Sequence, residues 1–368
     1  MDRSLIGIDV RMWNHSGIGR YLRELIGALS ALGDDHRYSF LGAGRDRAQI
    51  RHFFPNAGFK ESSASIYSPR EQKELFDFSK TVNLLHVPHF NAPLFCSSKL
   101  IVTVHDLIYL KEARFSGFFA GKLYAQALFR GIQANADAVI AVSDFTRKDL
   151  LKSFPKLEGK VTVIHESASA NFRQHANPLV LRAARERFGL FSPFVLFVGS
   201  FKAHKNLPVL LDAFEGIQKK SGAKYELVLA GKKDPKEKKL LRRLQSMPRV
   251  RCLENLGDTS LFELYHLAEA LVLPSLWEGF GLPVLEAMSC GTPVLCSDRS
   301  SLPEVAGDAA LLFDPERADH LEELLTQTLQ DSRLRQKLSS KGLERASHFS
   351  WEKAAQETLN LYEKVLSP

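Results

Sequence analysis

Short apolar runs alternate with segments of helical periodicity along almost the whole chain. In the first half, runs that read as buried strands fall at Leu5–Val10, Arg37–Leu41, Leu84–Val87, Leu100–Val104, Ala138–Val142 and Val161–Ile164. In the second half they fall at Phe194–Val198, Glu226–Ala230, Val250–Leu253, Ala270–Leu273, Val294–Cys296 and Ala310–Phe313. Continuously apolar strands separated by helices are typical of parallel sheets covered on both faces. The pattern therefore predicts an α/β protein with doubly wound sheets.

Helical patterns separate these runs and continue to the end of the chain. The clearest lie at Leu22–Leu32, Asn206–Gln218, Leu261–Ala268, Pro283–Cys290 and Asp331–His348. Ser350 has the pattern of a helix start before a further apolar-striped helix that reaches Leu366.

The length of 368 residues suits two domains of ordinary size. Periodicity is weak over Ser167–Leu190, which reads as a connection with one charged helix. We therefore expect a first domain over residues 1–170, a second over 190–349, and a final helix at 350–368.

Composition narrows the class of protein only a little. Apolar residues make up 45% and charged residues 25%, the balance of a soluble globular protein. No stretch approaches the roughly 20 apolar residues of a membrane span, and the start lacks the apolar segment of a signal peptide. The 4 cysteines show no Cys-x-x-Cys spacing, so buried reduced thiols and a cytoplasmic location are expected.

A net charge of +7 is a modest bias towards anionic partners. Nucleotides, phospholipid headgroups and nucleic acid all fit the charge alone. A nucleic-acid role would need a continuous basic face with exposed aromatics, which the sequence does not show.

The densest candidate site follows the run Ala270–Leu273. There the sequence Pro-Ser-Leu-Trp-Glu-Gly-Phe-Gly-Leu-Pro leads from the strand into a helix with Pro283 at its first position. Such a loop lies beyond the carboxyl end of a parallel strand, where these sheets bind ligands. Free N–H groups at the helix start, and glycines that allow close approach, suit a phosphate.

Two glutamates flank this loop. Glu286, one turn into the helix, is placed to accept hydrogen bonds from a ribose diol, and Glu278 is placed to reach a sugar. The plain alternative is a strand–loop–helix connection with two solvated glutamates. The Gly-Phe-Gly-Leu-Pro sequence between them favours the ligand site.

A lysine in the loop after Phe194–Val198 supports a diphosphate site. Lys205 comes just before a helix start, where an ammonium group can neutralise the charge that grows on a leaving diphosphate. Many enzymes that cleave nucleotide sugars instead use a divalent ion held by an Asp-x-Asp pair, and this sequence contains none. We therefore expect a nucleotide diphosphate sugar as co-substrate, with no metal and no cofactor. Lys202 taken alone reads as a solvated side chain.

In the first half, Gly17 and Gly19 follow Leu5–Val10 in an expected loop that brings backbone close to a ligand. The missing third glycine counts against a nicotinamide-binding loop.

Polar residues also follow two later strands. His105 and Asp106 come after Leu100–Val104, and for His105 a structural role and a sugar-contacting or acid–base role are equally open. Ser143 comes after Ala138–Val142, where a helix N-cap is favoured over an acceptor contact.

The segment Phe115–Arg130 is rich in aromatic and basic residues. Core packing explains most of its aromatics. The alternative is shallow membrane contact, useful for a lipid-linked acceptor, which would place the protein peripherally at the inner face of the plasma membrane. The basic run Lys232–Arg243 reads as a solvated helix face.

Together these segments resemble the family 4 retaining glycosyltransferases of the GT-B fold over essentially the whole chain. The motifs that carry the resemblance are Ser16-Gly-Ile-Gly-Arg-Tyr21, Val104-His-Asp-Leu107, Ala141-Val-Ser-Asp-Phe-Thr146, Val198-Gly-Ser-Phe-Lys-Ala-His-Lys-Asn206 and Glu278-Gly-Phe-Gly-Leu-Pro-Val-Leu-Glu286. The last is highly specific. The first motif and the Lys-Asn pair look most like bacterial mannosyltransferases of polysaccharide and O-antigen assembly.

The resemblance implies two Rossmann-like domains facing a cleft, with the final helix crossing back onto the first, acceptor-side domain. It gives Lys205 the donor diphosphate and Glu286 the ribose. The donor-site residues that it implies are Gly17, Gly19, Ser200, Lys205, Glu278, Phe280, Gly281, Leu282 and Glu286. The catalytic residues would be Glu278, His105 and Lys205.

The chain departs from the family pattern at three places. Ser200 stands where many members have an arginine that pairs with the lysine, and His204 replaces a basic residue. Val163–Ser167 lacks the usual Pro-Asn-Gly.

The expected reaction moves a hexose, first mannose from GDP-mannose, to a glycan or lipid-linked acceptor with retention. We favour a same-face substitution over a covalent intermediate, because no carboxylate of the first half other than Asp106 stands out as a nucleophile. The rivals are a non-catalytic nucleotide-sugar binder of the same fold, a sugar-nucleotide epimerase and, more weakly, a phosphorylase.

Overall fold

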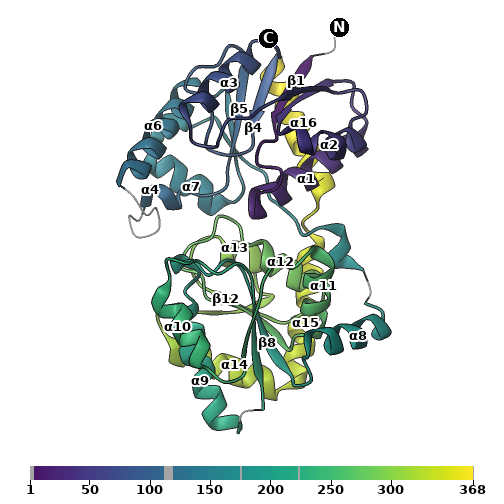
Figure 1. The fold of residues 1–368 in the computed structure, drawn as a ribbon, viewed down its shortest axis with the longest axis vertical. Helices are drawn as coiled ribbons and strands as arrows, with labels where there is room; N and C mark the ends of the chain where they lie inside the picture. The colour runs from purple at the N-terminus through teal and green to yellow at the C-terminus, as the bar shows by residue number, and fades with distance from the viewer. Residues whose placement is uncertain (1–3, 112–118, 175, 223, 368) are drawn as a thin grey trace. The chain divides into compact units, whose positions relative to one another are not determined.

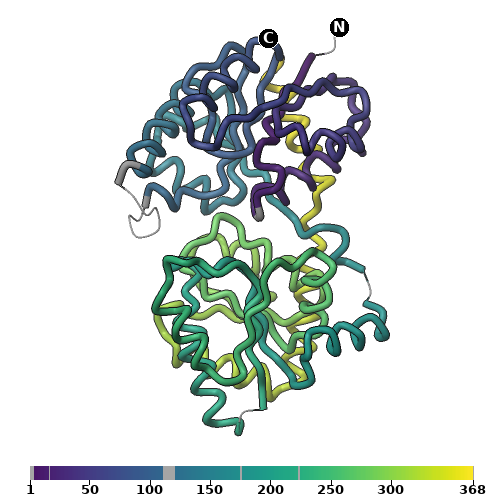
Figure 2. The backbone as a smooth tube through the Cα atoms, in the orientation of Figure 1, coloured from purple at the N-terminus to yellow at the C-terminus, as the bar shows by residue number. Residues whose placement is uncertain are grey.

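The computed structural model describes residues 4–111, 119–174, 176–222 and 224–367. The chain divides into two compact units: unit 1 is Met1–Glu166 with Ser350–Pro368, and unit 2 is Ser167–Phe349. Each unit is built of parallel strands covered by helices (Figure 1). Figure 2 follows the same path as a tube, and it shows the C-terminal residues running back through unit 1.

Unit 1 contains a seven-stranded parallel sheet in the order β3-β2-β1-β4-β5-β6-β7. Its strands are β1 (Leu5–Asp9), β2 (Arg37–Gly42), β3 (Gly58–Glu61), β4 (Leu84–Val87), β5 (Lys99–Val104), β6 (Ala138–Ala141) and β7 (Val161–Val163). Its helices are α1 (Ser16–Leu32), η1 (Gly44–Asp46), α2 (Arg47–Phe53), α3 (Pro69–Ser79), α4 (Ile108–Lys111), α6 (Phe119–Asn135), α7 (Asp144–Ser153), η2 (Pro155–Leu157) and α16 (Trp351–Leu366).

The last helix, α16, packs against α1 and is tied to the sheet by buried polar groups. The Tyr362 hydroxyl lies 2.6 Å from His86 Nδ1, and His86 Nε2 lies 2.8 Å from Thr103 Oγ1. Burial lowers the pKa of His86 to about 3, so this histidine is neutral. The Ser350 hydroxyl accepts from the Lys353 amide, which confirms the predicted helix start.

Unit 2 contains a six-stranded parallel sheet in the order β10-β9-β8-β11-β12-β13. Its strands are β8 (Phe194–Val198), β9 (Glu226–Ala230), β10 (Val250–Leu253), β11 (Ala270–Leu273), β12 (Val294–Ser297) and β13 (Ala310–Phe313). Its helices are η3 (Ala170–Arg173), α8 (Pro178–Phe188), η4 (Ala203–Lys205), α9 (Leu207–Ser221), α10 (Lys238–Ser246), α11 (Asp258–Leu267), α12 (Leu282–Ser289), α13 (Leu302–Ala306), α14 (Ala318–Gln330) and α15 (Ser332–Ser347).

All predicted strands are present, each with ends within one residue of the prediction. The sequence patterns missed β3, a sheet-edge strand whose residues are exposed or half-buried and form no apolar run. The sequence predicted a loop that ends just before Leu22. This prediction is wrong from Ser16 onward, because α1 begins at Ser16. A Cβ on Gly19 would lie 2.3 Å from the Trp13 carbonyl oxygen, so this glycine lets the first turn of α1 pack on its own preceding loop.

The aromatic and basic segment Phe115–Arg130 is only partly described, since residues 112–118 lie outside the described residues. Phe129 is fully buried and stacks on Phe90 and Phe154, with ring centroids 5.2 and 5.3 Å apart. Core packing therefore accounts for this aromatic. Within the described ranges, no helix is both long and apolar enough to cross a bilayer.

Candidate functional site

The strand order of unit 2 reverses between β8 and β11. From β8 the chain moves outward through β9 and β10, and from β11 it moves the other way through β12 and β13. Ligands of open parallel sheets bind at such a switch point, beyond the carboxyl ends of the two strands. Lys205 follows β8 at the end of η4, and Glu278 lies between β11 and α12.

Lys205 and Glu278 form an ion pair at this edge. Lys205 Nζ lies 2.5 Å from Glu278 Oε1, and the two side chains are only 13% and 12% exposed. The Ser275 hydroxyl donates to the same oxygen at 2.7 Å. Burial alone would raise the pKa of Glu278, but the charge of Lys205 and the hydrogen bonds from Lys205 and Ser275 outweigh it and lower the pKa. Glu278 is therefore an ionised carboxylate.

Two serines hold the backbone of the Glu278 loop. The Ser300 hydroxyl accepts from the Glu278 amide at 3.0 Å. Ser301 Oγ lies 3.0 Å from the Glu278 carbonyl oxygen and 2.9 Å from that of Phe280. The loop shape is thus fixed from the β12–α13 connection, which the sequence motifs did not identify.

The loop ends at the start of α12, where Gly281 is the N-cap and Pro283 lies in the first turn. Gly281 has φ +102°, and a Cβ there would lie 2.6 Å from Leu302 Cδ2. Glycine is therefore required for this approach. No side chain caps the start of α12. The positive end of the α12 dipole therefore lies at Leu282, at the carboxyl edge of the sheet.

Glu286 faces the interior of unit 2, one turn into α12. It is only 1% exposed, and the Tyr265 hydroxyl donates to its Oε2 at 2.7 Å. Nothing in the sequence pattern distinguished Tyr265, which lies on α11. The ribose contact expected of Glu286 stays a prediction.

The other donor-site residues expected from the sequence lie around the same edge. Ser200 is half-buried in the loop after β8, and Phe280 is 4% exposed. A Cβ on Gly231 would lie 1.9 Å from the Gly199 carbonyl oxygen, so the loops after β8 and β9 are in direct contact. Burial and the Lys205 charge lower the pKa of His204 to about 4, which makes it neutral at pH 7.

In unit 1, both ring nitrogens of His105 are engaged. Nδ1 lies 2.9 Å from Glu166 Oε1, and Nε2 lies 3.0 Å from the Pro88 carbonyl oxygen. A carbonyl and a carboxylate both accept, so the ring donates twice and is charged. Burial would lower the pKa of His105, but Glu166 outweighs it and raises the pKa. In this arrangement neither nitrogen accepts a proton, and the sugar contact expected of His105 stays a prediction.

Ser143 and Asp106 each accept a hydrogen bond from a backbone amide two or three residues further along the chain. The Ser143 hydroxyl accepts from the Thr146 amide at 3.0 Å, which confirms the expected N-cap of α7. Asp106 Oδ1 accepts from the Ile108 amide at 2.9 Å. Gly17 and Gly19 lie in the first turn of α1.

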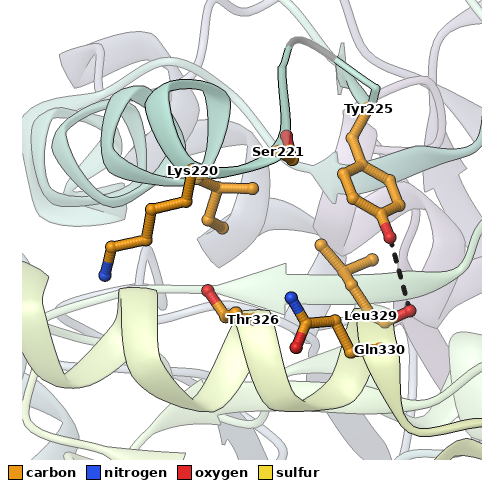
Figure 3. A pocket seen from close by; sticks show the side chains of 7 residues that line it. Lys220, Ser221, Tyr225, Thr326, Leu329 and Gln330 are labelled. Atoms are coloured by element: carbon orange, nitrogen blue, oxygen red, sulfur yellow. Dashed lines mark hydrogen bonds between the residues drawn. The ribbon is translucent and has the colours of Figure 1, made fainter.

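Two cavities lie away from the carboxyl edges. One of about 20 Å³ lies between the end of α9 and α14, where Tyr225 donates to the Leu329 carbonyl oxygen at 3.4 Å (Figure 3). It has room for about one water molecule. A pocket of about 470 Å³ in unit 1 is lined by Leu5, Arg37 and Gly58 at the amino ends of β1, β2 and β3, the opposite edge of that sheet.

Within the described residues, no group of three or more His, Cys, Asp or Glu side chains could hold a metal ion.

Family models match both units of the chain. Residues 15–167 match the model described as Glycosyltransferase Family 4, and residues 174–345 match that of Glycosyl transferases group 1. The chain is a family 4 glycosyltransferase. It is 27% identical over 368 residues to the O-antigen chain mannosyltransferase B of Escherichia coli, an alignment that covers 94% of this chain and 96% of the relative.

A second relative is longer. The glycosyltransferase is 29% identical over 296 residues to the serotype-specific mannosyltransferase WbdA of Escherichia coli, covering 76% of this chain and 35% of WbdA. Among solved structures, HepE of Anabaena in complex with UDP-glucose superposes with a TM-score of 0.79 at 16% identity, covering 98% of this chain and 100% of HepE. This likeness confirms the predicted GT-B fold of two Rossmann-like units.

Proposed function

We propose that this glycosyltransferase transfers mannose from GDP-mannose to a glycan or lipid-linked acceptor, with retention and without a divalent metal. The observation that carries the proposal is the Lys205–Glu278 pair, which lies at the switch point of unit 2 beside the start of α12. The enzyme would work on the cytoplasmic side of a membrane, and shallow contact of unit 1 with that membrane through the segment Phe115–Arg130 is a further part of the proposal.

The geometry supports a diphosphate ligand. An ammonium group carries three N–H donors, so Lys205 can keep its bond to Glu278 and still donate to a phosphate oxygen. The uncapped start of α12 adds backbone donors and the positive end of a helix dipole. Both would gain strength as negative charge develops on the departing diphosphate, which is the role that a divalent ion fills in other enzymes.

The carboxylates support a sugar nucleotide. Ionised Glu278 can accept hydrogen bonds from hydroxyls of the transferred hexose. Glu286 has lone pairs beyond the one that Tyr265 uses, so it can also accept from a ribose hydroxyl. Mannose as the hexose and GDP as the carrier are supported by the two mannosyltransferases among the relatives.

For the chemical step we propose substitution on one face of the sugar, in which the departing phosphate helps to remove the acceptor proton. A covalent intermediate would require a carboxylate nucleophile. Asp106 is the candidate from the sequence, and it already accepts from the Ile108 amide.

The test is a turnover assay of the whole protein with a panel of nucleotide sugars and a panel of glycan acceptors, each with and without EDTA. GDP-mannose should release GDP, EDTA should change the rate less than twofold, and the anomeric configuration should be kept. Loss of turnover in EDTA would contradict the metal-free mechanism. Donor binding without release would favour the non-catalytic binder, and an epimer formed without acceptor would favour the epimerase.

A further inference from the structure

Unit 1 has a switch point of its own, between β1 and β4. From β1 the strands move outward to β2 and β3, and the chain then returns beside β1 with β4. Arg11 follows β1, and His89 and Asn91 follow β4, so the three residues leave the same carboxyl edge where such sheets bind ligands. None of the three was given a role by the sequence motifs.

A buried carboxylate, Glu71 of α3, joins these residues into one cluster. Its Oε1 lies 3.0 Å from Arg11 Nη2 and accepts from the Asn91 side-chain amide. Its Oε2 accepts from the Tyr67 amide, and the Tyr67 hydroxyl lies 2.8 Å from His89 Nε2. Arg11, His89 and Asn91 are therefore each linked to the same carboxylate, directly or through Tyr67.

Each of these three side chains also carries a polar atom that the protein leaves unused. Arg11 Nη1, His89 Nδ1 and Asn91 Oδ1 are buried and have no hydrogen-bond partner among the described residues. The Arg11 side chain is 3% exposed, His89 7% and Asn91 1%. Buried polar groups in native proteins are almost always paired, with protein or with ordered water, so these atoms are open to partners beyond the described residues.

Tyr67 is the member of the cluster that reaches solvent. It is 41% exposed, its backbone has φ +65°, and its ring lies over Phe90 with centroids 5.8 Å apart. The same ring contacts His89 edge-on. The solvent-facing side chain of the cluster is therefore one that contacts His89 directly.

We propose that this cluster of Arg11, His89 and Asn91 is a subsite for an uncharged sugar ring of the acceptor. The proposal rests on the transferase function proposed above, which supplies the need for an acceptor. Arg11 Nη1 can only donate and Asn91 Oδ1 can only accept. A hydroxyl group does both, and neighbouring hydroxyls of a sugar can satisfy both atoms together.

The charges of the cluster argue against a phosphate of a lipid carrier at this position. Arg11 is bonded to the carboxylates of Asp9, at 2.6 Å, and Glu71, so it brings no net positive charge. Burial holds the pKa of His89 well below its usual range, so His89 adds none. A phosphate also has no proton to donate to Asn91 at neutral pH.

The test is the binding of neutral methyl α-glycosides of mannose, glucose, galactose and rhamnose to the whole protein. Ligand-observed NMR measures this binding directly. We expect at least one to bind, and Asn91→Ala and His89→Asn to weaken that binding tenfold or more. Tyr67→Phe, which removes the hydroxyl that lies 2.8 Å from His89 Nε2, should weaken it by a smaller factor. Methyl α-mannoside 6-phosphate should bind no better than the neutral mannoside.

A matched control is Tyr38→Phe, which removes a buried hydroxyl that donates to Asp34 at 2.6 Å. Tyr38 lies at the amino end of β2, away from the carboxyl edge that carries the cluster. It should leave glycoside binding unchanged. The subsite is overturned if no glycoside binds, if the variants bind like wild type, if the phosphorylated glycoside binds more tightly, or if a soaked crystal shows water only. Binding of GDP-mannose is measured separately, so failure of the donor function and failure of the subsite are distinguishable.

Discussion

The two units share one sheet plan but differ in the polar groups at their switch points. In unit 2, Lys205 and Glu278 form an ion pair, and the start of α12 lies beside them. In unit 1, Arg11 is held between two carboxylates, and three buried polar atoms of its cluster have no partner in the described part of the chain. One edge presents a cation and backbone donors, and the other presents donors and acceptors without net positive charge.

On the two proposals above, one fold binds two chemically different substrates. A diphosphate needs N–H donors and positive potential. The N–H groups of Lys205 that do not bond Glu278 can supply donors, and the start of α12 supplies the positive end of a helix dipole. A sugar needs paired donors and acceptors, which unit 1 supplies. The same topology therefore does not determine the ligand, and the side chains that follow the central strands do.

The largest expected effect comes from removing the cation of unit 2. Lys205→Ala should lower kcat/KM for donor cleavage by about 10²–10³, or about 3–4 kcal/mol, because the leaving diphosphate loses a direct partner. Nucleotide release measures it. Lys219→Ala, at the exposed end of α9, is the matched control and should change the rate less than twofold. Equal effects of the two substitutions on kcat/KM would contradict the proposed position of the diphosphate at this edge.

A change of pH should affect stability in opposite ways through one histidine of each unit. In unit 2, His204 has a pKa of about 4 instead of 6.5, so the unfolded chain takes up a proton that the folded chain does not. The free energy of unfolding should fall between pH 6.5 and 4, by up to about 3 kcal/mol at this residue. His204→Gln should reduce that loss in calorimetric scans.

In unit 1 the sign is opposite. The pKa of His105 is raised, so its contribution is fully present below pH 6.5 and is lost as the pH rises through the folded-state pKa. His105→Gln should therefore destabilise the protein more at pH 6 than at pH 9. The same loss at both pH values would contradict the charged pair with Glu166.

A smaller effect is expected at the proposed ribose contact. Glu286→Gln should lower kcat/KM for the donor about 10- to 100-fold, which corresponds to about 1.4–2.8 kcal/mol, since the amide cannot accept as the carboxylate does. Tyr265→Phe is the companion change. It should lower stability by about 0.5–1.5 kcal/mol with a lesser effect on the donor KM. A donor KM that is the same in Glu286→Gln and wild type would contradict the ribose role.

The smallest effect is expected at Asp106. Asp106→Asn should keep turnover within about threefold of wild type, because the proposed substitution uses no protein nucleophile. Steady-state kinetics would show it. A loss of about 10³ or more would restore the covalent mechanism.

The strands were predictable because each buried parallel strand is a compact apolar run. The edge strand β3 was not, since Gly58–Glu61 is half exposed. The start of α1 was also missed. Gly17 and Gly19 are poor helix formers, and only the packing of Gly19 on the Trp13 backbone shows why glycine stands there.

The motifs placed Lys205 and Glu278 after two parallel strands of unit 2, and the structure brings the two side chains within 2.5 Å of each other. Ser300, Ser301 and Tyr265 were missed, since they come from other elements and meet the site only in the folded chain. The unit 1 cluster was missed for the same reason. Arg11 and Asn91 follow predicted strands, but Glu71 lies on a helix that the pattern did not identify, and it alone joins them.

The most direct test of the donor assignment is a crystal structure of the protein with GDP-mannose, grown in EDTA. The assignment predicts the diphosphate within hydrogen-bond distance of Lys205 Nζ and of the first backbone amides of α12, with no metal ion between them. A diphosphate bound elsewhere, or one that binds only when a divalent ion is added back, would contradict it.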